Sequence, residues 1–283
     1  MIVYLKFWGT RGSIPAPGSD TVEFGGNTSC VEIVSEQGRR LVIDAGTGIR
    51  ALGDELVQSG RPVRLTLLLT HTHWDHILGM AFFRPVYLDN TDITIDGCPK
   101  AFWGLAKVFD DRKGNGYFPV AFDELKANIR HSERIANGPL QVGDLTVEGI
   151  EINHPQGGMG FKVMEHNRCL VFLTDNELRS DALVGRRPQD FAHFARGCDL
   201  LIHDAQYLPE EIADRRGWGH STYVEAVELA LQAGTRRLLL FHHDPARTDH
   251  QMREIEAKAR ELVKANGADL DVAAAREGEV IYV

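Results

Sequence analysis

The sequence is poor in cysteine, has no excess of basic residues and contains no long apolar run. Its 283 residues include 4 cysteines at scattered positions without paired spacing, so neither a disulfide framework nor a cysteine-based zinc site is indicated and we expect buried free thiols. The 31 Lys and Arg are outnumbered by 40 Asp and Glu, which gives a net charge of −9. A protein that binds a long phosphate backbone usually carries the opposite sign, so long nucleic acids are not expected partners.

Membrane segments are also not expected. The longest mainly apolar runs, such as Leu65–Leu69 and Leu238–Phe241, are far too short to span a bilayer. The first residues show no basic segment followed by an apolar stretch, so no signal peptide is predicted. We therefore expect a cytoplasmic protein. Hydrophobic residues at 43% and charged residues at 25% are typical of a globular chain with a substantial core.

Short runs rich in Val, Ile and Leu alternate with amphipathic segments along the chain. Strands are predicted at Val3–Trp8, Cys30–Ser35, Arg40–Asp44, Leu65–Thr70, Leu145–Ile152, Gly160–Met164, Cys169–Thr174, Leu200–Asp204, Arg237–Phe241 and Val280–Val283. Helices are predicted at Ile49–Gln58, Thr222–Ala233 and Asp249–Ala265. Strands in runs with helices between the runs favour an α/β fold in which helices cover sheets. No linker divides residues 1–283, so we predict one domain, with a lid-like insertion around residues 96–134.

The 12 histidines are the unusual feature of the composition. A predicted strand runs directly into His71-Thr72-His73-Trp74-Asp75-His76. In an extended stretch His71 and His73 point the same way, and Asp75 and His76, past a turn, can face a second centre. Imidazole and carboxylate ligands suit borderline divalent metals such as zinc.

This run is the His-x-His-x-Asp-His signature of the metallo-β-lactamase superfamily, and the resemblance extends through Asn153-His154-Pro155, Leu173-Thr174-Asp175 and Leu240-Phe241-His242-His243-Asp244-Pro245. It implies a four-layer αββα sandwich of two similar halves. It also implies two divalent metal ions, zinc first and manganese as the alternative, with Asp175 as the carboxylate shared between them. The implied ligands are His71, His73, His154, Asp175, Asp75, His76 and His242, with His243 as the alternative to His242.

A further motif points to one branch of the superfamily. Gly219-His220-Ser221-Thr222 resembles the phosphodiesterase branch, which includes ribonuclease Z and cyclic phosphodiesterases. The resemblance implies that His220 contacts the scissile phosphate, that Asp75 orients a hydroxide held by the metals, and that Asp204 supports His220. The alternative is that Ser221 or Thr222 caps a helix and His220 only belongs to its first turn.

The chain departs from ribonuclease Z in one respect. The common form of that enzyme carries an arm for transfer RNA between the third and fourth motifs, whereas here only residues 155–174 separate His154 from Asp175. We therefore expect a small phosphodiester substrate, most plausibly a cyclic nucleotide. Tyr117, Phe118 and Arg11 are the candidate substrate contacts.

The sequence is also compatible with other functions. They are ribonuclease Z-like processing of RNA 3′ ends, another hydrolysis on the same fold, a sulfur dioxygenase with one iron, and a degenerate fold that acts as a sensor or interaction module. Family resemblance also makes a homodimer plausible, with the 96–134 insertion as its contact.

Overall fold

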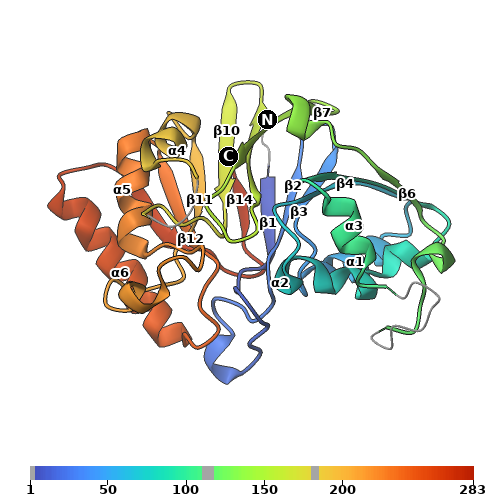
Figure 1. The fold of residues 1–283 in the computed structure, drawn as a ribbon, viewed down its shortest axis with the longest axis horizontal. Helices are drawn as coiled ribbons and strands as arrows, with labels where there is room; N and C mark the ends of the chain where they lie inside the picture. The colour runs from blue at the N-terminus through green and yellow to red at the C-terminus, as the bar shows by residue number, and fades with distance from the viewer. Residues whose placement is uncertain (1–3, 110–117, 180–184) are drawn as a thin grey trace.

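The computed structural model describes residues 4–109, 118–179 and 185–283, and these residues form two mixed β-sheets packed face to face (Figure 1). The first sheet has the order β14 (Val280–Tyr282), β1 (Tyr4–Gly9), β2 (Cys30–Val34), β3 (Arg40–Ile43), β4 (Val63–Leu69), β5 (Thr91–Gly97) and β6 (Asn128–His131). The second sheet has the order β13 (Asp271–Ala274), β12 (Arg237–Phe241), β11 (Leu200–Asp204), β10 (Arg168–Leu173), β9 (Met159–Glu165), β8 (Leu145–Glu151) and β7 (Leu140–Val142).

Each sheet combines a parallel part with an antiparallel part. Strands β3 to β6 pair in parallel in the first sheet, and β10 to β13 do so in the second. Parallel strands present their carboxyl ends at the same edge of a sheet, where α/β proteins gather ligands. This topology brings the loops that follow β4, β10 and β12 together.

Helices cover the two outer faces (Figure 1). Helices α1 (Ile49–Gln58), α2 (Trp74–Ile77) and α3 (Ala101–Ala106) lie beside the first sheet, and α4 (Pro188–Phe194), α5 (Tyr223–Ala233) and α6 (Asp249–Ala265) lie beside the second. The four-layer α/β sandwich predicted from the sequence is therefore confirmed. None of the helices in the described ranges combines the length and the apolar character of a membrane span.

The core between the sheets is built around aromatic side chains. Phe7 from the first sheet and Phe172 and Phe241 from the second are fully buried. The ring centroid of Phe241 lies 5.9 Å from that of Phe7 and 5.2 Å from that of Phe172. Because β12 ends at Phe241, this packing fixes the point from which the next residue leaves the sheet.

The predicted helices begin and end where their capping residues indicated. Thr222 precedes α5. Its hydroxyl accepts a hydrogen bond from the backbone N–H of Glu225, and its own backbone N–H donates to the carboxylate of Glu225. Gly234 ends the helix in the left-handed conformation. Strands β5, β6, β7 and β13 and the short helices were not predicted from the sequence. Strand β6, at the sheet edge, is largely polar and therefore lacks the apolar pattern of a buried strand.

The segment 96–134, predicted as a lid-like insertion, contains the end of β5, helix α3 and strand β6. Strand β6 pairs in parallel with β5 and forms the edge of the first sheet. Part of this segment, including Tyr117, lies outside the described residues. The role of the segment as a lid or subunit contact stays a prediction.

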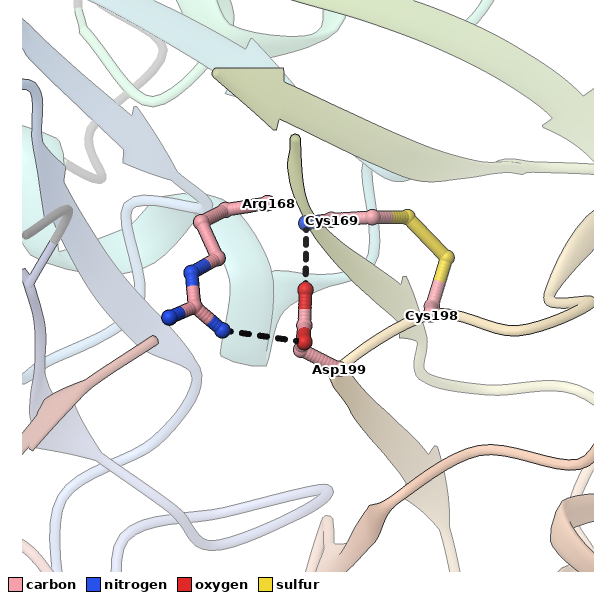
Figure 2. The surroundings of a disulfide bond; sticks show 4 residues. All are labelled: Arg168, Cys169, Cys198 and Asp199. Atoms are coloured by element: carbon pink, nitrogen blue, oxygen red, sulfur yellow. Dashed lines mark hydrogen bonds and ion pairs between the residues drawn. A yellow bond between two sulfur atoms is a disulfide. The ribbon is translucent and has the colours of Figure 1, made fainter. Parts of the chain in front are cut away.

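The expectation of free thiols is wrong for one pair of cysteines. Cys169 and Cys198 form a disulfide (Figure 2), whereas Cys30 and Cys98 are free and buried. Cys169 lies in β10 and Cys198 just before β11, and these parallel strands pair Leu170 with Leu200. The pairing brings the two Cα atoms to 4.9 Å, within the range for a disulfide. Because the two cysteines are 29 residues apart in the sequence, their proximity could not be predicted from their spacing.

Candidate metal centre

Segments that follow four strands, one of which includes helix α2, bring all seven predicted metal ligands to one edge of the sandwich. The segments follow β4, β8, β10 and β12. The ligand atoms form two groups, within each of which they lie no more than 4.8 Å apart. The first group is His71, His73 and His154, and the second is Asp75, His76, Asp175 and His242.

In the first group the imidazole nitrogens converge on a common point. Nδ1 of His73 lies 3.0 Å from Nε2 of His154. The ring centroid of His71 lies 4.6 Å from those of both other histidines. On its far side, Nε2 of His73 lies 2.8 Å from the amide oxygen of Gln156, a contact that orients the ring with Nδ1 toward the group. Buried Nε2 of His71 has no hydrogen-bond partner.

The second group joins two imidazoles to two carboxylates. Nε2 of His76 and Nε2 of His242 each lie 3.2 Å from Oδ2 of Asp75. The backbone N–H of Ser13 donates to the same oxygen over 2.7 Å. Nδ1 of His76 lies 2.8 Å from Oδ2 of Asp44, which fixes the ring with Nε2 toward the centre. Asp44, directly after β3, is a supporting residue that the sequence analysis did not assign.

Asp175 lies between the two groups. Its Oδ1 is 3.3 Å from Nε2 of His76 and 3.2 Å from Nε2 of His242. Its Oδ2 is 3.6 Å from Nε2 of His71, in the other group. One oxygen therefore faces each group, which is the arrangement that a carboxylate shared by two ions needs.

The charges of these residues suit divalent cations. Burial raises the pKa of Asp75 and Asp175, but the neighbouring histidines hold both well below the ordinary value, so both are anionic. Burial lowers the pKa of His71 well below its ordinary value, which favours the neutral form that binds metal. The two groups offer nitrogen and oxygen ligand atoms, and the buried Nε2 of His71 has no hydrogen-bond partner, so the residues fit two divalent ions.

Three residues of the site have left-handed backbone conformations, which are uncommon outside glycine. The φ angles are 64° for Asp44, 51° for Asp175 and 60° for His242. Each residue lies just beyond the end of a strand. There the left-handed conformation interrupts the alternation of side chains between the two sheet faces and turns the side chain toward the site. Such backbone costs on the order of 1–3 kcal/mol per residue and is found mainly at functional sites.

His220 lies beside the two groups, and Asp204 holds it there as predicted. Nδ1 of His220 is 2.8 Å from Oδ2 of Asp204 and 4.0 Å from Oδ2 of Asp175. Its ring stacks on that of His242, with centroids 5.0 Å apart. Burial alone lowers the pKa of His220, but the charge and hydrogen bond of Asp204, with smaller effects of Asp175 and Asp75, raise it to about 9.

The loop that carries His220 is held by Glu177, which sequence reasoning missed. This fully buried carboxylate accepts from the backbone N–H groups of Gly217, over 2.9 Å, and Gly219, over 3.0 Å. A Cβ on Gly219 would come within 1.9 Å of Nδ1 of His154, so only glycine fits here, with φ +93°. The signal in the sequence was the polar run Asp175-Asn176-Glu177 directly after a buried strand.

The structure contradicts the predicted substrate contact of Arg11. Its side chain is fully buried and donates to three backbone carbonyls, from Nε to Gly25 over 2.6 Å and from Nη1 to Asp244 over 3.0 Å and Arg247 over 2.9 Å. Arg11 therefore joins the loop after β1 to the loop after His242 and is not available to substrate.

The adjacent histidines His242 and His243 face different ways. His242 belongs to the second ligand group, whereas Nε2–H of His243 donates to the carbonyl of Ala275 over 2.8 Å. Burial first, and then the charge of Arg11, lower the pKa of His243 to about 3. The geometry therefore favours His242, and not His243, as the ligand.

Two hollows flank the candidate centre. One, of about 350 Å³, is lined by His71, His73 and His154 among others. The other, of about 620 Å³, is largely apolar and is lined by Trp74, Phe82 and Phe118 among others. Thr72 lines both, so the two hollows adjoin. Phe118, one of the predicted substrate contacts, therefore lies in a pocket next to the ligand groups, whereas Tyr117 lies outside the described residues.

Comparison with known proteins identifies the family. Residues 39–243, more than half of the chain, match the beta-lactamase superfamily domain. Ribonuclease Z of Gemmatimonas aurantiaca is 29% identical over 327 aligned residues, covering 98% of each chain. Among solved structures, the metallo-beta-lactamase fold protein YhfI from Bacillus subtilis has a TM-score of 0.72 at 19% identity, covering 100% of both chains. Yeast PDE1 has a TM-score of 0.69 at 16% identity, also covering 100% of both. The chain therefore belongs to the beta-lactamase superfamily and is a metal-dependent hydrolase.

Proposed function

We propose that the chain is a phosphodiesterase with two metal ions that hydrolyses small phosphodiesters, cyclic nucleotides foremost. The observation that carries the proposal is the pair of His220 and Asp204 beside Asp175. A histidine held in this way can donate hydrogen bonds to a charged oxygen, and a phosphodiester carries such an oxygen at its reacting group. A lactam or a thioester has no such charge, so this pair favours a phosphodiester over those substrates.

The roles of the individual residues follow from their contacts. Two bound divalent ions would supply an activated water and positive charge beside the phosphoryl oxygens. His71, His73, His154, Asp75, His76, Asp175 and His242 would hold them. Asp75, whose Oδ2 the backbone of Ser13 fixes, would orient the attacking water by accepting its hydrogen bond. His220 would bind a phosphoryl oxygen and give its proton to the leaving oxygen, while Asp204 holds the ring in position.

The two adjoining hollows support a nucleotide as the substrate. The hollow beside His71, His73 and His154 has about 350 Å³, which is large enough for a phosphoryl group and a sugar. The apolar pocket next to it exposes Trp74, whose accessibility is 79%, together with Phe82 and Phe118. Aromatic faces stack on any base, so this pocket could take the base while the phosphate lies at the metals.

The experiment is a substrate panel with metal-replete protein. The panel contains 3′,5′- and 2′,3′-cyclic nucleotides, a bis-aryl phosphodiester and a transfer RNA precursor, and we expect cleavage of cyclic nucleotides. His220→Ala should keep its metal content and lose most turnover, whereas the control His250→Ala, at an exposed histidine on α6, should keep both. Intact turnover in His220→Ala would show that the role of His220 is wrong.

A second candidate is processing of RNA 3′ ends. It is favoured by the relative named Ribonuclease Z, which is covered over 98% of its length. The short segment between His154 and Asp175 forms β9 and β10 and leaves no room for an additional arm. Cleavage of the precursor alone in the same panel would select this candidate over the first.

Three accompanying expectations need their own measurements. Zinc is the proposed metal, with manganese as the alternative, and elemental analysis of purified protein tests it; a single iron with oxygen uptake would support a dioxygenase. A homodimer is tested by light scattering. A cytoplasmic location stays a prediction, and the disulfide between Cys169 and Cys198 weighs against it, because reducing compartments rarely keep such bonds.

A further inference from the structure

A second concave site lies at the other end of the first sheet. The metal ligands follow the carboxyl end of β4, whereas this groove is lined by Val63 to Thr66, where β4 begins. Strand β4 has 7 residues, so the two sites lie on the order of 20 Å apart along the strand. The groove has a volume of about 940 Å³ and also involves the end of α1 and the turn between β7 and β8.

The groove is basic although the chain is acidic. Its lining contains five arginines but only two carboxylates, Glu55 and Asp92. The arginines are Arg39, Arg40, Arg61, Arg64 and Arg130. Arg40 is paired with the buried carboxylate of Glu32, which leaves a surplus of two positive charges, in contrast with the net charge of −9 for the whole chain. The groove is thus a locally basic surface on an acidic chain.

The sheet register places part of this charge in an ordered array. Arg64 of β4 is paired with Asp92 of β5, which is paired with Asn128 of β6. Nη2 of Arg130 lies 3.1 Å from Oδ1 of Asp92, and Nε of Arg64 lies 3.7 Å from its Oδ2. One carboxylate therefore orients two guanidinium groups, each of which has five N–H donors and keeps some of them free.

Further donors lie in the neighbouring row and on the opposite wall. Thr66 is paired with Thr94, and within the described part of the chain neither hydroxyl has a hydrogen-bond partner. Arg61 and Arg39 have no ion-pair partner in residues 4–109, 118–179 and 185–283. A Cβ on Gly143 would lie 2.4 Å from Cγ of Arg39, so the stem of that arginine packs against the β7–β8 turn.

We propose that this groove binds consecutive phosphate groups of an oligoanion. Guanidinium forks pair with phosphate oxygens in a bidentate manner, and threonine hydroxyls are common additional donors. A ligand with a single carboxylate would use one arginine, whereas a row of phosphates can use the array around Asp92 together with Arg61. The phosphates belong either to an RNA strand or to a free polyphosphate. The proposal does not depend on the proposed function, because the groove lies away from the metal centre.

The test measures binding of a fluorescein-labelled single-stranded RNA of 12 nucleotides to the metal-replete protein by anisotropy, with inorganic tripolyphosphate as competitor. The variant carries Arg61→Glu and Arg64→Glu, and the control carries Arg196→Glu and Arg236→Glu, which change the net charge equally on the other half of the molecule. We expect the groove variant to weaken RNA binding at least tenfold and to lower the salt slope by about 2, since each lost phosphate contact lowers it by about 1. The control should bind like the wild type.

Several readouts separate the outcomes. Turnover of the bis-aryl phosphodiester should be the same in all three proteins, which shows that the variants are folded. Because turnover and RNA binding are measured separately, failure of the proposed phosphodiesterase activity can be distinguished from failure of the proposed groove. If the added glutamates disturb the fold, the neutral variant Arg39→Gln with Arg61→Gln provides the test instead. It should also weaken RNA binding. Displacement of RNA by tripolyphosphate identifies a free polyphosphate as a competent ligand, whereas no displacement identifies the strand; either supports the shared chemistry. Equal weakening in groove variant and control, or no binding of either probe by the wild type, would overturn the proposal.

Discussion

Replacement of Arg11 separates a structural role from a substrate contact. The buried guanidinium donates to three carbonyls, in the loop before β2 and in the loop after His242. Arg11→Met keeps the length and apolar volume of the side chain and removes all three donors. The substitution therefore probes the hydrogen bonds while it leaves little cavity behind.

The size of the effect follows from these bonds. A hydrogen bond that involves a charged group contributes about 1.5–3 kcal/mol, so three of them contribute about 4.5 kcal/mol or more. Part of this is offset by burial of the cation, which also lowers the pKa of Arg11. We expect the free energy of unfolding to fall by about 3 kcal/mol in Arg11→Met. Arg11→Lys keeps the charge but lacks the fork, so it should lose about half as much.

Urea unfolding followed by circular dichroism measures the change. With an m-value of about 3 kcal/mol/M, the midpoint should fall by about 1 M. The KM for a phosphodiester, measured without urea, should not change, because Arg11 does not reach the site. An unchanged midpoint together with a KM raised tenfold or more would refute this reasoning and would restore the phosphate contact that the sequence had suggested.

Three further predictions concern the disulfide, the loop of His220 and pH. Cys169→Ser opens a loop of about 30 residues, so thermal unfolding should show a loss of about 3–4 kcal/mol, with wild type in reductant behaving like the variant. Glu177→Gln should lower kcat by about 10- to 100-fold at unchanged metal content, because the neutral amide keeps only one acceptor oxygen and replaces the other by an NH2 donor beside the His220 loop; equal loss in metal content would contradict a positioning role. His203 is buried, and burial lowers its pKa, so as the pH falls the imidazole is protonated in the unfolded chain before it is protonated in the folded one. The contribution of His203 to the free energy of unfolding is therefore full above a pH of about 6.5 and decreases as the pH drops below it. The loss between pH 7.5 and pH 5.5, from urea midpoints, should therefore be smaller in His203→Asn than in the wild type.

The convergence of the proposed ligands could be predicted from the sequence because each of them is tied to a local pattern. His71 and His73 follow the apolar strand β4, and Asp175 and His242 follow β10 and β12 in the same way. A buried strand and a polar residue just beyond it are both visible in a single stretch of chain. The parallel topology then brings such strand ends together.

The supporting residues could not be predicted in the same way, because their partners come from distant segments. Glu177 holds the backbone of Gly217 and Gly219, and a carboxylate that binds backbone N–H groups has no preferred partner type in the sequence. Arg11 was misjudged for a related reason. Arginine near a glycine-rich turn suggests phosphate binding, and only the fold shows that the side chain is buried and that its Nε and Nη1 donate to three carbonyls.

The pairing of β14 with β1 has a consequence for synthesis. Tyr4 and Leu5 pair with Tyr282 and Ile281, so the first strand of the sheet acquires one of its two neighbours from the far end of the sequence. At roughly 5–20 residues per second, the ribosome adds the partner of β1 about 14–55 s after β1 itself. During that interval one edge of β1 is open to pairing with other chains, and chaperones that cover strand edges would act on this nascent intermediate.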